Sequence, residues 1–232
     1  MQAAPHTLSP DLSFGVFNSS SGTFVLPSLP FEINALMPVT GPETIQLHLG
    51  KHHQNYIDSA NKLLESIERR FETAAEVVSF ARDTDTKPLL ENAGQAINPA
   101  FFWACHQAAG LTRPTGSLEV AINAVFGDFD AFIEAAVKLG KSRIGSGWIW
   151  LMANDKGEVS LVLTQDAETL LDDETQTALL VCDIWEHAYY LDHSSDRAGW
   201  ITSFFEQLVD WKFAQLRYDS SFSLEPIAPS GV

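Results

Sequence analysis

The fold is decided by the sequence GWIWLMANDKGEVSLVLT at residues 147–164. Residues 147–152 and 158–164 are apolar and rich in β-branched and aromatic side chains, a composition that favours strands. The segment between them, Asn154-Asp155-Lys156-Gly157, is a favourable hairpin turn. A third apolar, β-rich run covers Leu179 to Ile184. The second half of the chain is therefore predicted to contain three strands.

Helical patterns lie on both sides of these strands. A long helix is predicted to begin near Pro42, a favoured first helical residue, and to end near Arg70. A second helix is predicted over residues 88–107, before the linker 112–116. Further helices are predicted over residues 118–126, 129–139 and 200–216. The fold class is accordingly α+β.

The chain divides into four parts on this pattern. Residues 1–30 are rich in Ser, Pro and Gly and predict an irregular N-terminal arm. Residues 31–112 predict a helical hairpin domain, and residues 117–218 predict an α/β domain. Residues 219–232 remain as a C-terminal tail.

Composition excludes several classes of protein. The 14 basic and 30 acidic side chains give a net charge of −16, which disfavours nucleic acid and anionic membranes as partners. No apolar run is long enough to span a bilayer, and no Lys or Arg precedes Lys51, so neither a signal peptide nor a transit peptide is supported. Two cysteines, Cys105 and Cys182, form no disulfide framework. A cytoplasmic location is therefore expected.

Two groups of residues could carry chemistry. His48, His52 and Tyr56 are spaced four apart, so they project from one helical face, and imidazole is the commonest nitrogen ligand of metals. Histidines on a helix are nevertheless more often surface or core residues than ligands. Asp183 ends an apolar strand, where a carboxylate needs a cation or strong donors, and His187 follows four residues later. The alternative is an Asp helix cap with an incidental His, and the motif alone leaves both interpretations open.

Three stretches, in order, resemble the iron/manganese superoxide dismutase family from about Phe24 to Leu216. They are LHLGKHHQNY at 47–56, GSGWIWL at 145–151 and DIWEHAYY at 183–190. The resemblance implies an N-terminal helical hairpin followed by an α/β domain with a three-stranded antiparallel sheet. It also implies one buried mononuclear metal ion that disproportionates superoxide or handles another small oxygen species.

The resemblance assigns roles by position. His48, Asp183 and His187 would be the metal ligands. Tyr56 and His52 would line the substrate funnel, Trp148 and Trp185 would wall the pocket, and Tyr56 and Gln95 would handle protons. Glu186 would contact His187 of a partner subunit and Tyr190 would contact the partner's His52, which implies a homodimer. Lys51 and Arg197 are candidates for steering a small anion.

Iron and manganese members of this family differ in which segment of the chain supplies a glutamine beside the metal ligands. The tract Asn92-Ala93-Gly94-Gln95 resembles the iron form, which supplies the glutamine from the second helix. Ala167 occupies the place where manganese forms usually carry theirs. Iron is therefore the expected cofactor, with manganese as the alternative ion.

The chain departs from the family at one ligand. Aligning Phe101-Phe102-Trp103 places Pro99 where the family carries a further ligand histidine. Proline cannot bind a metal, and a kink or bulge is expected at it because it removes an N–H and clashes with the carbonyl of Gln95. His106 shares the face but lies about 10 Å along the helix, too far to substitute. Asn98 could reach in only through its amide oxygen.

Three functions follow from this departure. In the first, the chain would be an iron-type superoxide dismutase, which would convert superoxide to oxygen and hydrogen peroxide. Alternatively, two histidines and one carboxylate form the set used by non-haem iron oxygenases, and the site does oxygen chemistry on an organic substrate. The third possibility is a metal-poor structural relative. The first is favoured because the surrounding residues of the site are retained.

Overall fold

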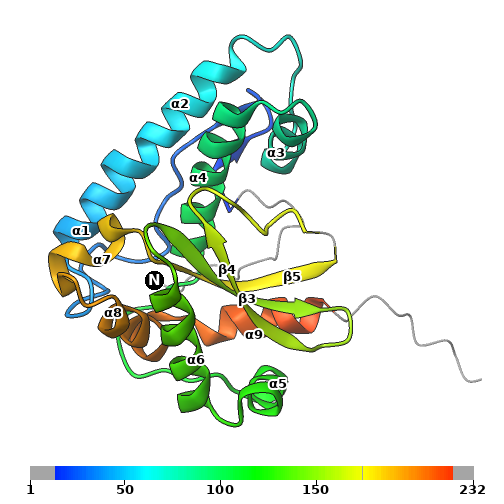
Figure 1. Cartoon of the computed structure of the whole chain (residues 1–232). Helices are drawn as coiled ribbons and strands as arrows, with labels where there is room; N and C mark the ends of the chain where they lie inside the picture. Colours follow the sequence, from blue (N-terminus) through cyan, green and yellow to red (C-terminus); the bar gives the residue numbers. More distant parts are fainter. Residues whose placement is uncertain (1–13, 174, 222–232) are drawn as a thin grey trace, which may run out of the picture.

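A helical part and a sheet-containing part meet along one central helix in the computed structural model, which describes residues 14–173 and 175–221 (Figure 1). The helical part contains β1 (Phe17–Asn18), β2 (Thr23–Phe24), α1 (Pro42–Leu47), the π-helical η1 (His48–His53), α2 (Gln54–Leu64), α3 (Ala74–Asp83) and α4 (Lys87–Ala104). The second part contains α5 (Gly116–Phe126), α6 (Phe129–Ser142), β3 (Gly147–Asn154), β4 (Val159–Gln165), β5 (Gln176–Asp183), α7 (Glu186–His193), α8 (Arg197–Ser203), the π-helical η2 (Phe204–Leu208) and α9 (Trp211–Ser220).

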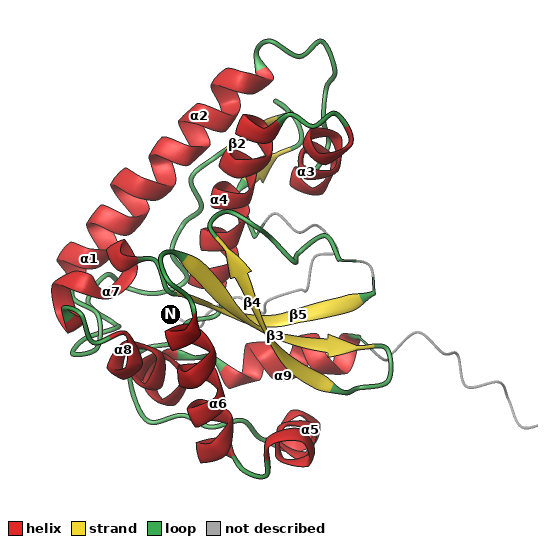
Figure 2. Cartoon of the chain, viewed as in Figure 1, coloured by secondary structure: helices red, strands yellow, loops and turns green. Residues whose placement is uncertain are grey.

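The sheet confirms the predicted fold class and has the strand order β4-β3-β5, antiparallel throughout. Strand β3 is central and is buried along its length up to its last residue, which explains its uninterrupted apolar sequence. The register places Trp148 opposite both Thr164 of β4 and Asp183 of β5. The sheet therefore brings a buried indole beside the carboxylate at the end of β5. Helices α6 and α9 are drawn on the side of the sheet away from α2 (Figure 2).

The first long helix begins at Pro42 as predicted but is not uniform. Its middle turn, His48–His53, is π-helical, and the helix ends at Leu64 rather than near Arg70. Single π-helical turns are concentrated at functional sites because the extra residue redirects side chains. Here the buried imidazole of His53 bonds the carbonyl of Ala96 in α4 at 2.8 Å. The π turn therefore ties the first long helix to the central helix.

Helix α4 is the core of the helical part. It begins with Pro88 in its first turn, and its residues from Ala93 to Trp103 are all buried. It packs against α2 and α3 on one side and against β5 on the other. A bulge was predicted at Pro99, but the α-helix runs without interruption from Lys87 to Ala104 and contains no bulge there. A mid-helix proline costs about 3 kcal/mol, and we attribute the tolerance of this one to the packing that surrounds α4.

Three further predictions about helices and the arm differ from the structure. The helix α3 was not predicted, since its ten residues are too short for a strong periodic signal. The last predicted helix is divided into α8, η2 and α9, with a bend at Val209 and Asp210 where the side chain of Asp210 caps α9. Residues 17–24 of the predicted irregular arm form a small β1–β2 hairpin, and Val16 just before it and Phe24 within it are buried. Residues 1–13 of the arm lie outside the described residues.

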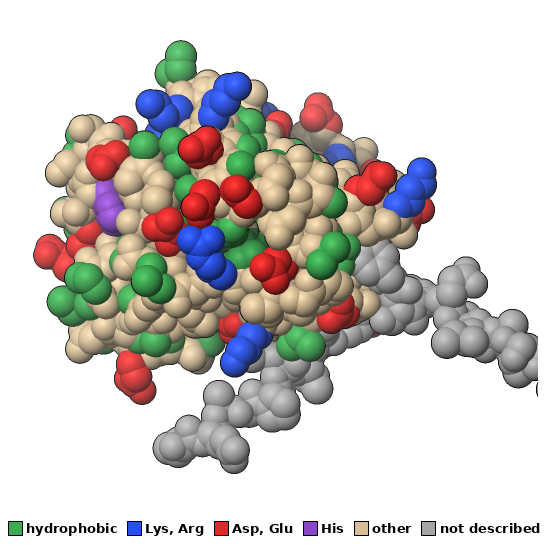
Figure 3. Space-filling model, turned by 90° about the horizontal axis from the view of Figure 1, so that it is seen from below, with side chains coloured by type: hydrophobic (Ala, Val, Ile, Leu, Met, Phe, Trp, Pro, Cys, Tyr) green, Lys and Arg blue, Asp and Glu red, His purple; other side chains and the backbone are tan. Residues whose placement is uncertain are grey.

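Surface charge is mixed rather than segregated on the face shown in Figure 3, where acidic side chains lie among scattered Lys and Arg. No helix within residues 14–173 and 175–221 is long and apolar enough to cross a membrane.

One glycine controls how closely the sheet part approaches α4. A methyl group at Gly94 would collide with the carbonyl oxygen of Ala167, in the loop after β4. We expect Gly94→Ala to lower the free energy of unfolding by about 1–3 kcal/mol, because the neighbour is backbone and cannot rotate away. Chemical denaturation measures this change. Gly110→Ala is the control, since a methyl group there meets no atom within 4 Å; equal losses in both variants would contradict the explanation.

Candidate metal centre

Three donor side chains from distant parts of the chain converge at one point. His48 comes from η1, Asp183 from the end of β5 and His187 from the first turn of α7. The Oδ2 atom of Asp183 lies 3.2 Å from Nε2 of His48 and 3.6 Å from Nε2 of His187. One donor atom from each residue lies within 4.8 Å of the others. The arrangement combines two imidazoles with one carboxylate, a donor set suited to iron.

The donor atoms of this cluster are not used by hydrogen bonds. Asp183 is fully buried, and its Oδ1 accepts the backbone N–H of Trp185 at 2.7 Å. Its Oδ2 and the buried Nε2 of His48 have no hydrogen-bond partner among the described residues. Buried polar atoms are paired in nearly all proteins, and a buried carboxylate oxygen without a donor is costly. A cation between the three side chains accounts for both atoms, so the residues fit a metal ion.

The protonation states also suit metal binding. Burial, helped by the neighbouring His187, lowers the pKa of His48 to about 4, so its imidazole is neutral at pH 7. Burial opposes ionisation of Asp183, but the adjacent His187 and His48 outweigh it and hold the pKa of this carboxyl below its usual value. A neutral imidazole and an ionised carboxylate are the forms that bind metals.

Two indoles form a wall beside the cluster. Trp148 and Trp185 both donate their Nε1–H to the carbonyl oxygen of Asp166, at 2.9 and 3.3 Å. Asp166 has a φ of 46°, a left-handed conformation that Asp tolerates better than most residues. The ring of Trp185 lies 5.5 Å from that of His187. The sequence prediction included both tryptophans but missed Asp166, for which the only local signal is an aspartate directly after a strand.

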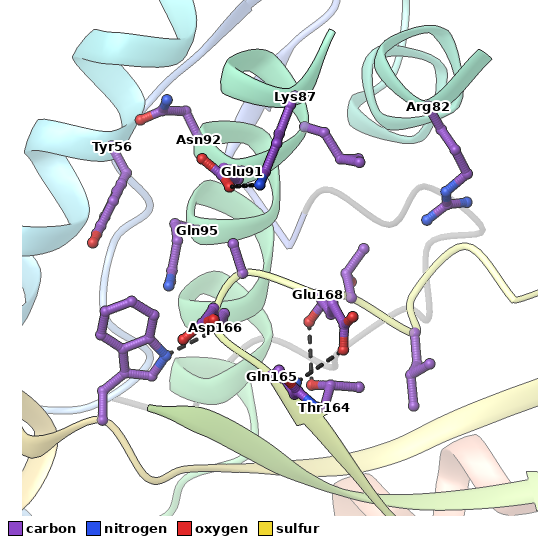
Figure 4. Close-up of a pocket in the computed structure, with 15 residues that line it drawn as sticks. Tyr56, Arg82, Lys87, Glu91, Asn92, Gln95, Thr164, Gln165, Asp166 and Glu168 are labelled. Atoms are coloured by element: carbon purple, nitrogen blue, oxygen red, sulfur yellow. Dashed lines mark hydrogen bonds and ion pairs between the residues drawn. The ribbon is translucent and has the colours of Figure 1, made fainter. Parts of the chain in front are cut away.

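Of the three residues expected to serve the substrate, His52 contacts the cluster, and Tyr56 and Gln95 line a cavity beside Trp185. The imidazole of His52 stacks on that of His187, with ring centroids 4.6 Å apart and planes at 14°. Tyr56 and Gln95 line a cavity of about 790 Å³ that Trp185 also borders. Figure 4 shows Tyr56 from α2 and Gln95 from α4 projecting toward a common space, with Asp166 opposite. Burial and the charge of Asp183 raise the pKa of Tyr56, so its hydroxyl keeps its proton at neutral pH.

Two candidate steering residues have different surroundings. Lys51 is exposed. Arg197 instead donates to the Tyr189 hydroxyl at 3.1 Å and to the backbone carbonyls of Arg143 and Gly145 at 2.8 and 3.0 Å. Its guanidinium is therefore engaged in joining α8 to the loop before β3, and the proposal that it steers an anion is not supported.

The residues near Pro99 supply no fourth donor of the usual types. Among the His, Cys, Asp and Glu residues of the described chain, only His48, Asp183 and His187 gather in this way. The helix predicted to reach residue 107 ends at Ala104, so His106 does not share a helical face with Pro99, and its Nδ1 is 2.6 Å from the carbonyl oxygen of Phe102. Asn98 donates its amide N–H to the carbonyl of Glu168 at 3.0 Å.

Burial of His106 predicts an acid-dependent loss of stability. Burial lowers the pKa of His106 to about 3, whereas an exposed histidine titrates near 6.5. The unfolded chain therefore binds a proton that the folded chain does not, so this stability is complete above about pH 6.5 and is lost as the pH falls toward 3. The free energy of unfolding is expected to fall less steeply with decreasing pH in His106→Gln. The difference in slope is up to about 1.4 kcal/mol per pH unit. Parallel curves for the two proteins between pH 6 and 4 would refute this.

Comparison with known proteins agrees with this geometry. Residues 23–107 match iron/manganese superoxide dismutases, alpha-hairpin domain, and residues 114–217 match the C-terminal domain of the same proteins. An iron superoxide dismutase of Synechocystis sp. is 38% identical over 191 residues, which cover 82% of this chain and 95% of the relative. One from Legionella pneumophila is 38% identical over 192 residues, covering 83% and 97%. One from Coxiella burnetii is 35% identical over 197 residues, covering 85% and 99%.

Proposed function

The chain belongs to the iron/manganese superoxide dismutase family, and we propose that it is an iron-type superoxide dismutase, an oxidoreductase that converts superoxide to oxygen and hydrogen peroxide. The observation that carries the proposal is the convergence of His48, Asp183 and His187 on one point, with Oδ2 of Asp183 free of hydrogen bonds. The several relatives named as iron enzymes support iron as the cofactor.

The chain's own residues would hold iron and control its surroundings. His48, Asp183 and His187 would bind the ion, which supplies one-electron chemistry by alternating between two oxidation states. Trp148 and Trp185 exclude bulk water from one side of the ligands, which strengthens the electrostatic interactions there. The phenol of Tyr56 holds a proton beside the cavity, because burial keeps its pKa raised.

The position of Gln95 supports iron over manganese. This buried side chain comes from α4, one residue after Gly94, whose Cα is packed on the carbonyl of Ala167. The second helix therefore supplies the amide, and the loop after β4 contributes only the small Ala167 at this contact. Manganese remains the alternative ion.

We further propose a homodimer formed through the surface beside His52 and His187. Glu186 and Tyr190 lie on α7 and are exposed, Tyr190 by 49%. The apolar side chains of Leu47 and Leu191 are also exposed, by 37% and 58%. Exposed apolar groups of this kind beside a polar site are typical of subunit contacts. A cytoplasmic location is supported by Cys105 and Cys182, which are both buried and form no disulfide.

Metal analysis combined with superoxide consumption tests the proposal. The purified protein is stripped of metal and reloaded separately with iron and with manganese. We expect about one ion per chain and superoxide consumption by the iron form, with the metal-free protein as the control. Binding of iron without any acceleration of superoxide loss would refute the assignment as a dismutase.

One observation favours a second candidate function. The cluster contains two histidines and one carboxylate, which is the donor set of non-haem iron proteins that activate oxygen for an organic substrate. Iron-dependent oxygen uptake that rises on addition of an organic compound would support this alternative. A protein that binds no metal under reducing, iron-rich conditions would instead be a metal-poor structural relative.

A further inference from the structure

We infer that the metal ion of this chain takes a small, hydrogen-bond-accepting anion at the place where Pro99 provides no ligand. The inference rests on the proposed function, because it requires iron to be held by His48, Asp183 and His187. The anion would bind beside these three side chains, and the groups that surround this position determine which class of anion fits.

Pro99 lies on the side of α4 that faces the metal cluster. Residues three and four apart on a helix share a face. Phe102 and Trp103 follow Pro99 at these spacings, and their rings lie 5.6 and 4.6 Å from the ring of His48. Gln95 precedes Pro99 by four residues and lines a cavity that is also bordered by Trp185, the neighbour of His187. Pro99 is buried between them, on the face of α4 that meets His48.

The neighbouring side chains do not replace a ligand at Pro99. His106 lies beyond the end of α4 at Ala104 and pairs with Val209, with its ring against Phe102 and Phe204 at 4.4 and 5.4 Å. The amide nitrogen of Asn98 is held by the carbonyl of Glu168, and its Oδ1, which has no hydrogen-bond partner among the described residues, belongs to a residue about 100° around the helix from Pro99. Three protein donors leave an iron ion with more positions for small molecules than four do.

Two buried hydrogen-bond donors on α4 indicate the class of the bound anion. Nε2 of Gln95 and Nε1 of Trp103 have no hydrogen-bond partner among the described residues, and their side chains are only 2% and 3% exposed. Both atoms are N–H donors, so a partner must accept hydrogen bonds. They lie on the turns that precede and follow Pro99. A water molecule or a ligand ordinarily satisfies such buried groups.

Charge selects an anion over a neutral acceptor. The ligands at the cluster contribute one anionic carboxylate, and imidazoles bind metals in their neutral form, so a divalent or trivalent iron ion keeps a net positive charge. In a buried site this charge attracts a small anion strongly. Hydroxide, azide and formate combine an anionic donor atom with hydrogen-bond acceptor capacity, and azide provides a convenient optical probe.

Azide titration of the ferric protein tests the inference. We expect the wild type to bind two azide ions per iron, seen as two steps in its charge-transfer absorption. Pro99→His, which restores an imidazole, is expected to bind one azide and to hold iron at least about 10-fold more tightly in chelator competition. Pro99→Ala restores the backbone N–H without a ligand, and it is expected to keep two azide sites.

A further variant protects the test against misfolding of Pro99→His. Trp103→Phe removes one N–H donor, and we expect it to weaken the second azide step several-fold and to leave the first unchanged. An iron-loaded, superoxide-consuming wild type with a single azide site would overturn the inference and leave the proposed function intact. A wild type that binds no iron would overturn both.

Discussion

Asp183→Asn is expected to abolish iron binding and, with it, superoxide consumption. The substitution removes the charge of the fully buried carboxylate and leaves the size of the side chain unchanged. Its Oδ2 lies 3.2 and 3.6 Å from the two imidazoles, so no other anionic group of the cluster compensates for the charge. Changes to groups that only support a metal ligand already cost up to about 100-fold in affinity. We therefore expect a loss of at least ~100-fold for the ligand itself.

Iron content after reconstitution and chelator competition measure this loss. The metal-free variant is expected to melt close to the metal-free wild type, because Asn retains an oxygen for the backbone N–H of Trp185. Asp196→Asn is the matched control, since it makes the same chemical change at a helix cap where Asn serves equally well. Normal iron content in Asp183→Asn would show that the converging side chains are not the metal site.

Trp200→Phe is expected to cause the second largest effect, on stability and metal affinity together. Trp200 is buried, and its indole N–H donates to the backbone carbonyl of Asp183 at 2.7 Å. Phenylalanine leaves this carbonyl without that donor and leaves space where the second ring was. The combined cost is about 2–4 kcal/mol in the free energy of unfolding. Because the hydrogen bond holds the residue that carries the carboxylate, iron affinity is expected to fall ~10-fold.

A second buried tryptophan separates these two effects. Trp211 is 3% exposed, and its indole N–H donates to the carbonyl of Phe205 at 3.2 Å, away from the cluster. Trp211→Phe is therefore expected to lower the free energy of unfolding by a comparable amount without changing iron affinity. Denaturation curves and metal competition on the same preparations make the comparison. Equal losses of iron affinity in both variants would mean that Trp200 acts only through global stability.

The sequence was sufficient for elements that depend on neighbouring residues. The hairpin around Asn154 and Gly157 and the start of the first long helix at Pro42 were both predicted, because turn chemistry and helix starts are local properties. Family resemblance over three motifs predicts His48, Asp183 and His187 as metal ligands, and the structure places these three side chains close together. The resemblance also showed that Pro99 stands where the family carries a ligand histidine. This is a difference in residue type, so it can be seen without a structure.

Other features depended on contacts between segments far apart in the chain. The π turn at His48–His53, the unbroken helix through Pro99 and the division of the last helix are each set by packing, which a single segment does not encode. The carbonyl of Asp166 holds two tryptophans through its backbone, and backbone groups carry no residue-specific signal. Arg197 was a candidate for steering an anion because its side chain is charged, but its hydrogen bonds give it a structural role.

The metal centre shows the same division most clearly. The sequence predicts the types of its donor side chains, since only certain side chains bind metals and they occur in a recognisable order. The sequence does not predict where these side chains meet, because residues 48 and 183 are brought together by the packing of η1 against α4 and by the pairing of β5 with β3. The sequence also showed that Pro99 cannot be a ligand. Only the tertiary structure showed that Gln95 and Trp103 present unpaired N–H groups on either side of it, because burial and hydrogen-bond pairing are properties of the folded chain.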